Sequence, residues 1–460
     1  MDAVAGRRVG VAPQTGVAVI MVSAAEQLAA NLKFSTFAKA DELKQRLLFT
    51  LGALLIYRLG TFIPIPGIDT AQLAKLFEGN PNTVFGMLNV FSGGALSRSA
   101  IFLLNIMPYI TASIIIQLLT SVVPTLENLR KEGEQGRKQL NQYTRYLTVL
   151  IATVQSTLTA QGLNSSALEP GWFFQLTTVI SLVGGTMFLV WLGEQITARG
   201  IGNGSSLIIF AGIVAEMPTA LYRILEQGRS GVLSPAVILG LFVMMIVVVT
   251  VVVFFERAQR RLTIQYPKRQ IGNRMFQGDS SHLPLKLNAS GVIPPIFAST
   301  LLYLPATVEQ FMGRGSDELT RVLSLLGPGQ PLHILFYIGL IVFFCFFYTP
   351  IVINPQETAD NLKKYGGFIP GIRPGPRTAE YIEYVLNRIT LVGAAYVSAV
   401  CILPEILSYQ MQAPFYFGGT SLLIVVSVTM DTVAQVQSHL LAHQYEGLIK
   451  KAKLRGAKRR

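Results

Sequence analysis

Apolar residues gather into ten long runs along this chain, separated by segments rich in polar and charged residues. The hydrocarbon core of a bilayer is about 30 Å thick, and a helix needs about 20 apolar residues to cross it. The pattern therefore predicts ten membrane-spanning helices, at residues 47–65, 99–123, 146–163, 173–192, 205–221, 233–255, 289–306, 332–353, 389–407 and 415–433.

A short apolar segment, residues 83–91, precedes the second run and is too short to cross a bilayer. Gly93 and Gly94 separate it from that run. Two interpretations are open at this point. The segment is either an interfacial or re-entrant piece buried in the protein, or a movable stopper over a pore.

One face of the second run changes from aliphatic to polar along its length. Ile106, Ile110, Ser113 and Gln117 recur at helical spacing, so they share one side of a helix. The amide of Gln117 does not suit a face packed against lipid. It does suit a polar funnel that narrows to an aliphatic constriction. The pattern favours a pore.

Composition supports a membrane protein with many spans. Hydrophobic residues make up 51% of the 460 positions and charged residues only 14%, which is more apolar than an ordinary soluble protein. Lys and Arg accumulate on the cytoplasmic side of a membrane, and most of the 38 in this chain fall on one side if the N-terminus is inside. Both termini are therefore predicted to be cytoplasmic.

Ten spans divide naturally after the fifth. The predicted segments are a cytoplasmic N-terminal segment at 1–46, a first half at 47–230 with the short apolar segment at 83–94, a second half at 231–436 with cytoplasmic loops at 256–287 and 354–388, and a basic tail at 437–460. Because five is odd, the second half begins on the opposite side from the first. An inverted pair of halves around a central path is an architecture that many transporters use.

Catalytic, metal and cofactor chemistry are not indicated by the sequence. No glycine-rich phosphate loop with its lysine is present, and GIGNG at 200–204 is expected to be a tight turn. His439 and His443 share a helix face without a third ligand nearby, so a solvated helix is expected there and no metal site. Cys345 and Cys401 lie in separate apolar runs and are expected to be core residues. The chain is predicted not to be an enzyme.

Ionisable residues within the runs are few and lie toward the ends: Arg58, Glu194, Glu216, Glu405 and Asp431. They are expected to reach the interface by snorkelling. Charges inside spans usually mark ion pathways, so their scarcity disfavours a proton-coupled or sodium-coupled carrier.

Two long polar loops carry clustered basic residues. In the first, Leu262, Ile264 and Tyr266 alternate with polar residues as in a hairpin strand. In the second, PGIRPG at 370–375 presents Arg373 in a proline-framed turn. Such clusters suit phosphate backbones and acidic partners, although the cytoplasmic bias of Lys and Arg alone also produces basic loops.

The chain also contains several longer motifs in register: FIPIPGID at 62–69, FSGGALSR at 91–98, IMPYITASIIIQLL at 106–119, GEQITARGIGNG at 193–204 and NPQETADNLKK at 354–364. These motifs resemble the SecY family, the channel subunits of the bacterial Sec protein translocase. The resemblance implies an all-α polytopic membrane protein with ten transmembrane helices in two inverted five-helix halves around a central pore, closed by a re-entrant plug helix. It also places the usual start of the chain nearer Met21, so Met1 is expected to be a misassigned start.

The resemblance implies roles for particular residues. The mid-membrane pore ring corresponds to Ile106, Ile110, Ser205, Ile209, Ile296 and Ile424. The plug includes Phe85, Met87, Leu88, Val90, Phe91, Gly93 and Gly94. The lateral gate, between the second and seventh spans, includes Ser113, Gln117, Pro294, Pro295 and Ser299. Arg274, Arg373 and Arg377 are expected to bind partners.

Two positions depart from the family pattern. Ser205 stands where the family has a branched aliphatic residue, and its hydroxyl is expected to make the ring slightly wetter. Pro295 is an additional proline, and with Pro294 it is expected to kink or loosen the seventh span.

The resemblance implies that the protein passes unfolded, signal-bearing polypeptides across the bacterial inner (plasma) membrane and releases hydrophobic segments sideways into lipid. The expected partners are the SecE and SecG subunits, the SecA ATPase, ribosomal RNA and proteins, signal-sequence-bearing polypeptides and membrane lipids, with no cofactor. A secondary transporter of a small solute and a membrane docking scaffold for ribosomes are the competing hypotheses. The first lacks intramembrane charge, and the second leaves the stopper and the isoleucine face unexplained.

Overall fold

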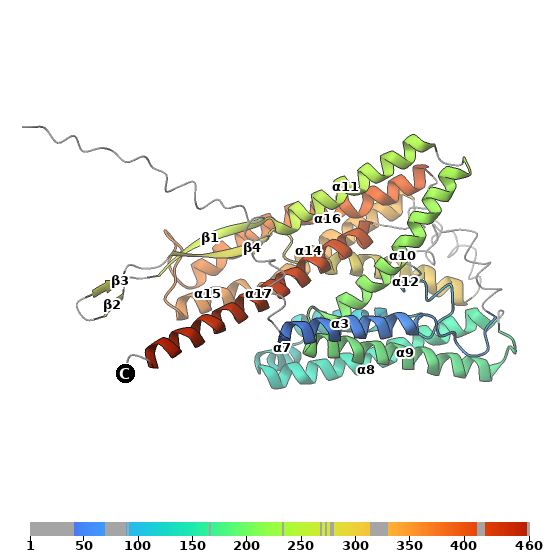
Figure 1. Ribbon diagram of the computed structural model, residues 1–460, viewed down its shortest axis with the longest axis horizontal. Coiled ribbons are helices and arrows are strands. Elements are labelled where there is room, and N and C mark those ends of the chain that lie inside the picture. The colour runs from blue at the N-terminus through green and yellow to red at the C-terminus, as the bar shows by residue number, and fades with distance from the viewer. Residues whose placement is uncertain are drawn as a thin grey trace, which may run out of the picture.

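The computed structural model describes residues 41–69, 89, 92–164, 167–231, 234–266, 269–271, 274–276, 280–312, 330–411 and 419–457. Each of the ten predicted spans falls on a helix within these residues (Figure 1). In chain order these helices are α3 (Asp41–Gly60), α6 (Met107–Val122), α8 (Glu134–Leu163), α9 (Trp172–Arg199), α10 (Gly204–Arg229), α11 (Pro235–Arg257), α12 (Ile293–Met312), α14 (Pro331–Val352), α16 (Pro376–Met411) and α17 (Gly419–Ala457).

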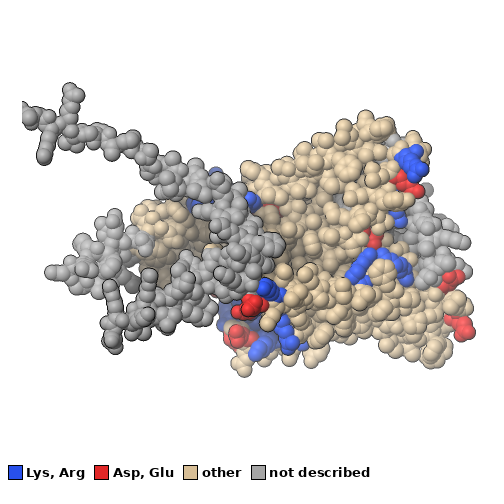
Figure 2. Space-filling model, viewed as in Figure 1, with Lys and Arg blue, Asp and Glu red and all other residues tan. Residues whose placement is uncertain are grey.

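Six helices of the described part are long and apolar enough to cross a membrane, and seven if α6 is counted together with α7 (Pro124–Lys131), from which it is bent by 99°. The remaining helices carry charged first turns or have a shorter apolar stretch, such as 293–302 in α12. On the face drawn in Figure 2, most of the described surface is uncharged, and the charged groups gather mainly toward its two ends. Such a surface is typical of a protein that sits within a bilayer.

The second span differs from its prediction. Residues 92–106 form successive turns, and the helix begins only at Met107. Ser99 and Asn105 have φ angles of 46° and 50°, a left-handed conformation that an α-helix does not accommodate. Pro108 lies in the first turn of α6, where its missing N–H costs no hydrogen bond.

The expectation that Pro294 and Pro295 kink the seventh span is wrong. Helix α12 begins at Ile293, so both prolines lie in its first turn. The N–H groups of a first turn have no partner within the helix, so the two prolines that follow Ile293 do not break this helix.

The two polar loops form a small layer at one end of the molecule. Strand β1 (Gln259–Gln265) pairs antiparallel with β4 (Ser280–Lys286), and β2 (Arg269–Ile271) pairs with β3 (Arg274–Phe276). Leu262 and Ile264 are buried with residues from α15 (Pro355–Lys364) and α16, which confirms the predicted hairpin strand. Figure 1 shows these strands, α15 and the C-terminal end of α17 at the same end of the molecule.

Candidate functional site

A cavity of about 670 Å³ lies between α6, α8, α9, α10 and α12. Its polar wall comes from side chains on four of these helices or next to them: Tyr109, Ser113, Gln117, Asn141, Arg145, Glu194, Gln195, Thr197, Asn203, Ser205 and Ser206. The cavity has both a polar wall and an aliphatic wall, so it can hold a chain of mixed character.

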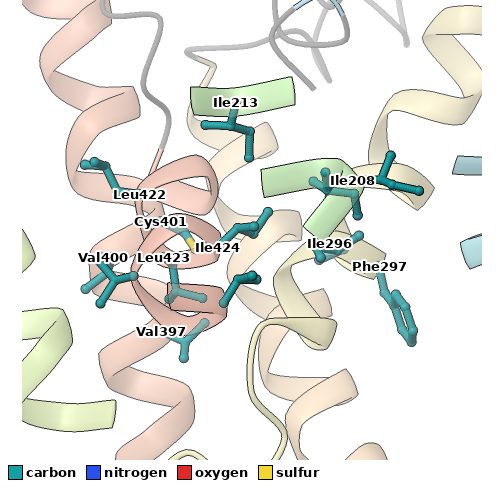
Figure 3. Packing of buried hydrophobic residues seen from close by; sticks show 14 of the residues in the cluster. Ile208, Ile213, Ile296, Phe297, Val397, Val400, Cys401, Leu422, Leu423 and Ile424 are labelled. Carbon is teal, nitrogen blue, oxygen red and sulfur yellow. The ribbon is translucent and has the colours of Figure 1, made fainter. Parts of the chain in front are cut away.

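Isoleucines form the aliphatic wall of this cavity. Ile106, Ile110, Ile209 and Ile296 line it, and Ile424 is packed in the same cluster of buried side chains without lining the cavity. Ile106 is 1% exposed, Ile209 4% and Ile424 1%. Figure 3 shows Ile208, Ile296 and Ile424, from α10, α12 and α17, within one group of apolar side chains. We call the five isoleucines 106, 110, 209, 296 and 424 the aliphatic layer.

Ser205 lies next to the aliphatic layer, and its hydroxyl is already engaged. It donates a hydrogen bond of 2.8 Å to Oδ1 of Asn203, the N-cap of α10. The same Oδ1 accepts from the Ser205 backbone N–H at 3.2 Å, as an N-cap side chain does. The hydroxyl therefore belongs to the polar start of α10, one turn before Ile209.

An ion pair stands in the polar wall. The guanidinium of Arg145 on α8 donates to both carboxylate oxygens of Glu194 on α9, at 3.0 and 2.7 Å. This bidentate geometry is the strongest form of an Arg–carboxylate pair. The two charges compensate each other, and the other polar side chains of the wall are neutral.

The proposed gate residues divide between two helices. Ser113 and Gln117 line the cavity from α6, and the Gln117 amide donates to the Ser113 hydroxyl at 3.0 Å. Pro294, Pro295 and Ser299 are buried in α12. Neighbouring residues of α12, among them Ile296 and Phe297, line the cavity, so α6 and α12 contribute two of its walls.

Of the expected plug residues, Phe85, Met87, Leu88, Val90 and Phe91 lie outside the described residues. Gly93 and Gly94 are described, and their φ angles are +65° and +80°. Glycine adopts this left-handed conformation without steric cost. A Cβ on Gly93 would stand 3.0 Å from the Cα of Gly212 in α10, so the glycine pair serves a tight turn and a close backbone approach.

A charged cluster surrounds this turn, and the sequence pattern did not reveal it. Arg58 donates to the carbonyl of Gly93 at 2.7 Å, and Arg98 donates to the same carbonyl at 3.2 Å. Arg98 also pairs with Glu216 of α10 at 3.2 Å. Arg58 and Glu216, which were expected to reach the interface by snorkelling, therefore both have polar partners within the protein.

The expected partner-binding arginines lie at the end of the molecule that carries the strands. Arg373 and Arg377 are exposed, at the turn before α16 and in its first turn. Arg274 is the first residue of β3. The three lie on two loops, which are joined by an isolated bridge between Gln265 and Phe368.

Both cysteines are buried, as expected of core residues. Cys345 is 1% exposed and Cys401 3%, and neither forms a disulfide. Within the described part of the chain, no group of three or more His, Cys, Asp or Glu side chains could hold a metal ion.

The comparisons with known proteins agree with this architecture. The SecY family model matches residues 100–433. The chain is 56% identical to the Escherichia coli K12 protein translocase subunit SecY over 423 residues, which are 90% of this chain and 96% of that protein. It is 53% identical to the Vibrio cholerae subunit, over 90% of this chain and 96% of that one, and 51% identical to the Rickettsia bellii subunit, over 92% of this chain and 100% of that one.

Solved structures share the fold at lower identity. A structure described as a protein conducting channel superimposes with a TM-score of 0.65 at 18% identity, covering 86% of this chain and 92% of that one. The canine Sec61 structure, from a ribosome-channel complex, gives 0.61 at 18% identity with the same coverage. The predicted channel fold is therefore confirmed, and the chain belongs to the SecY family.

Proposed function

We propose that this chain is the protein-conducting channel subunit of a Sec translocase. Unfolded polypeptides would cross the membrane through the cavity and the aliphatic layer. Hydrophobic segments would leave sideways between α6 and α12. The observation that carries the proposal is a cavity with a polar wall that ends on isoleucines contributed by several helices.

The chemistry of the polar wall fits a passage for chains of any sequence. Its one pair of charged side chains, Arg145 and Glu194, is mutually neutralised, and the rest of its polar groups are uncharged hydroxyls and amides. A wall without net charge neither holds nor repels basic or acidic segments strongly. A solute carrier, by contrast, would need a few fixed groups converging on one ligand.

The aliphatic layer supplies the seal. Branched apolar side chains leave water without hydrogen-bond partners, so a narrow layer of them resists wetting and ion flow. Ser205 supports this role less than an aliphatic residue would, but its hydroxyl is bonded to Asn203. We assign the pore ring to the aliphatic layer with Ser205 at its edge.

The same proposal gives the chain its surroundings. Residues 47–230 and 231–436 would be two inverted halves in a bacterial inner membrane with both termini in the cytoplasm, and residues 83–94 would be the plug. The exposed Arg373 and Arg377, with Arg274, would receive a ribosome or the SecA ATPase, and SecE and SecG would complete the channel. The energy for transport would come from those partners, since this chain is predicted not to be an enzyme.

Site-specific photo-crosslinking tests conduction directly. A photoreactive amino acid at Ile110, which lines the cavity, is combined with a secretory precursor arrested halfway through insertion. We expect a crosslink from position 110 to the mature part of the precursor. The matched control carries the same photoreactive residue at Leu239 of α11, which is 68% exposed on the outside of the molecule.

The outcomes separate the hypotheses. A crosslink at position 110 and none at position 239 supports a channel. Capture only by photoreactive residues in the loops at 256–287 and 354–388 would indicate a docking scaffold and overturn the proposal.

A further inference from the structure

The carbonyl of Gly93 is held by two arginines. Arg58 of α3 donates to it at 2.7 Å and Arg98 at 3.2 Å. A carbonyl oxygen has two lone pairs, so two charge-assisted donors use its full capacity. The preceding Ser92 carbonyl accepts from the Tyr57 hydroxyl at 3.4 Å. The turn at 92–94 is thus fastened to α3 through its backbone.

The two guanidinium groups also share an aromatic ring. The Cζ of Arg58 lies 4.8 Å and that of Arg98 4.4 Å from the centre of the Phe62 ring. Cations at such distances are attracted by the face of a ring. Two like charges this close to one ring repel each other, however, and they need a compensating anion.

Glu216 is that anion. Its carboxylate pairs with Arg98 at 3.2 Å, and its side chain is only 17% exposed. It lies one helical turn after Gly212, whose backbone abuts Gly93, so α10 contributes both the packing surface and the countercharge. A charged side chain within a span is costly unless it is paired, and it is therefore a functional-site hypothesis by default.

We propose that Arg58, Arg98 and Glu216 form a latch that holds the turn at Gly93 and Gly94 and sets the ease with which the channel opens. This inference rests on the proposed channel function. The latch joins α3, the turn and α10, and α10 also carries Ile209 of the aliphatic layer. A displacement of the turn at 92–94 must break the two donor contacts to the Gly93 carbonyl or move both arginines. The Arg98–Glu216 pair opposes the movement of Arg98.

The glycines fit this role. A Cβ on Gly94 would collide with the Arg98 guanidinium and the Glu216 carboxylate. The turn therefore brings the backbone into direct contact with the charged pair. Because the turn and the pair are in contact, a change in the charge or position of Arg98 or Glu216 acts directly on the turn.

The test is the resting ion leak of the complete translocase in lipid vesicles. Glu216→Gln keeps the shape of the side chain and removes its charge, which leaves Arg98 beside Arg58 without a countercharge. We expect the leak to rise about tenfold, which corresponds to about 1.4 kcal/mol. Glu226→Gln is the matched control, because Glu226 lies on the same helix with an exposed side chain, and its leak should equal that of the wild type.

A double-mutant cycle separates a latch from a general loss of stability. The double variant Arg98→Gln with Glu216→Gln should leak less than the sum of the two single effects predicts, because each single change already breaks the pair. Additive effects, or a Glu216→Gln leak equal to that of Glu226→Gln, would overturn the latch. Translocation of a secretory precursor by the wild type is measured in parallel. If the wild type translocates the precursor, a negative result refutes only the latch and not the channel function. If the wild type does not translocate it, the proposed function itself is refuted.

Discussion

Truncating Ile209 should open the seal in proportion to the carbon atoms removed. Ile209 lines the cavity and is 4% exposed, so nearly its whole side chain is withheld from water in this structure. Wetting of the layer requires that this side chain be hydrated. Each buried CH₂ group contributes about 0.8 kcal/mol against hydration.

The magnitudes follow from the number of carbons lost. Ile209→Val removes one carbon, which lowers the cost of wetting by about 0.8 kcal/mol and raises the resting leak about fourfold. Ile209→Ala removes three, which lowers it by about 2.4 kcal/mol and raises the leak roughly fiftyfold. The leak is measured as potassium efflux from vesicles that contain the translocase without precursor.

The control is an equal truncation away from the cavity. Leu239 on α11 is 68% exposed, and Leu239→Ala should leave the leak unchanged. A flat response across the Ile209 series, or an equal rise for Leu239→Ala, would refute the reasoning that Ile209 belongs to a hydrophobic seal.

Three further predictions concern other parts of the molecule. Gly204→Ala should lower the thermal stability of the purified protein, because the added Cβ would collide with the carbonyl of Gly193. The control Gly240→Ala, whose Cβ would have no atom within 4 Å, should leave stability unchanged or raise it by up to about 1 kcal/mol. Equal effects of the two substitutions would contradict the tight contact between α9 and α10. Arg373→Ala should weaken binding of the ribosome or the SecA ATPase in a salt-dependent manner, as measured by co-sedimentation at two salt concentrations, and should leave the resting ion leak unchanged. An unchanged binding affinity would remove Arg373 from the docking surface. Cys345, which is 1% exposed, should resist a maleimide until the protein is denatured, and rapid labelling of the native protein, followed by mass spectrometry, would contradict its burial.

The helices and the hairpin strand could be predicted from the amino-acid sequence. Spans such as 332–353 and 233–255 agree closely with α14 and α11, because long apolar runs have one solution in a bilayer, a helix that satisfies its own backbone. The alternation of Leu262 and Ile264 gave a strand for the same kind of reason, since a period of two is a local property. The prediction of a helix was wrong where the backbone adopts positive φ angles, as at Ser99 and Asn105.

The prolines show how position within an element reverses a residue's effect. Pro294 and Pro295 would break a helix at its centre, but at the start of α12 they are compatible with it. The sequence placed the seventh span a few residues too early, at 289, and that small shift changed the inferred role of both residues. The apolar run could not place the helix start, because Ala289 and Val292, which precede the helix, are apolar as well.

The sequence by itself determined that the chain has ten apolar segments, that its basic residues favour one side, and that the Ile106–Gln117 face is graded from aliphatic to polar. These are properties of periodicity and composition. Only the tertiary structure decided which charges meet. Arg58 and Glu216 are 158 positions apart in the chain, and both converge on the turn at Gly93. Likewise Arg145 and Glu194 neutralise each other across two helices. Such pairings depend on how helices pack, and no spacing along the chain encodes them.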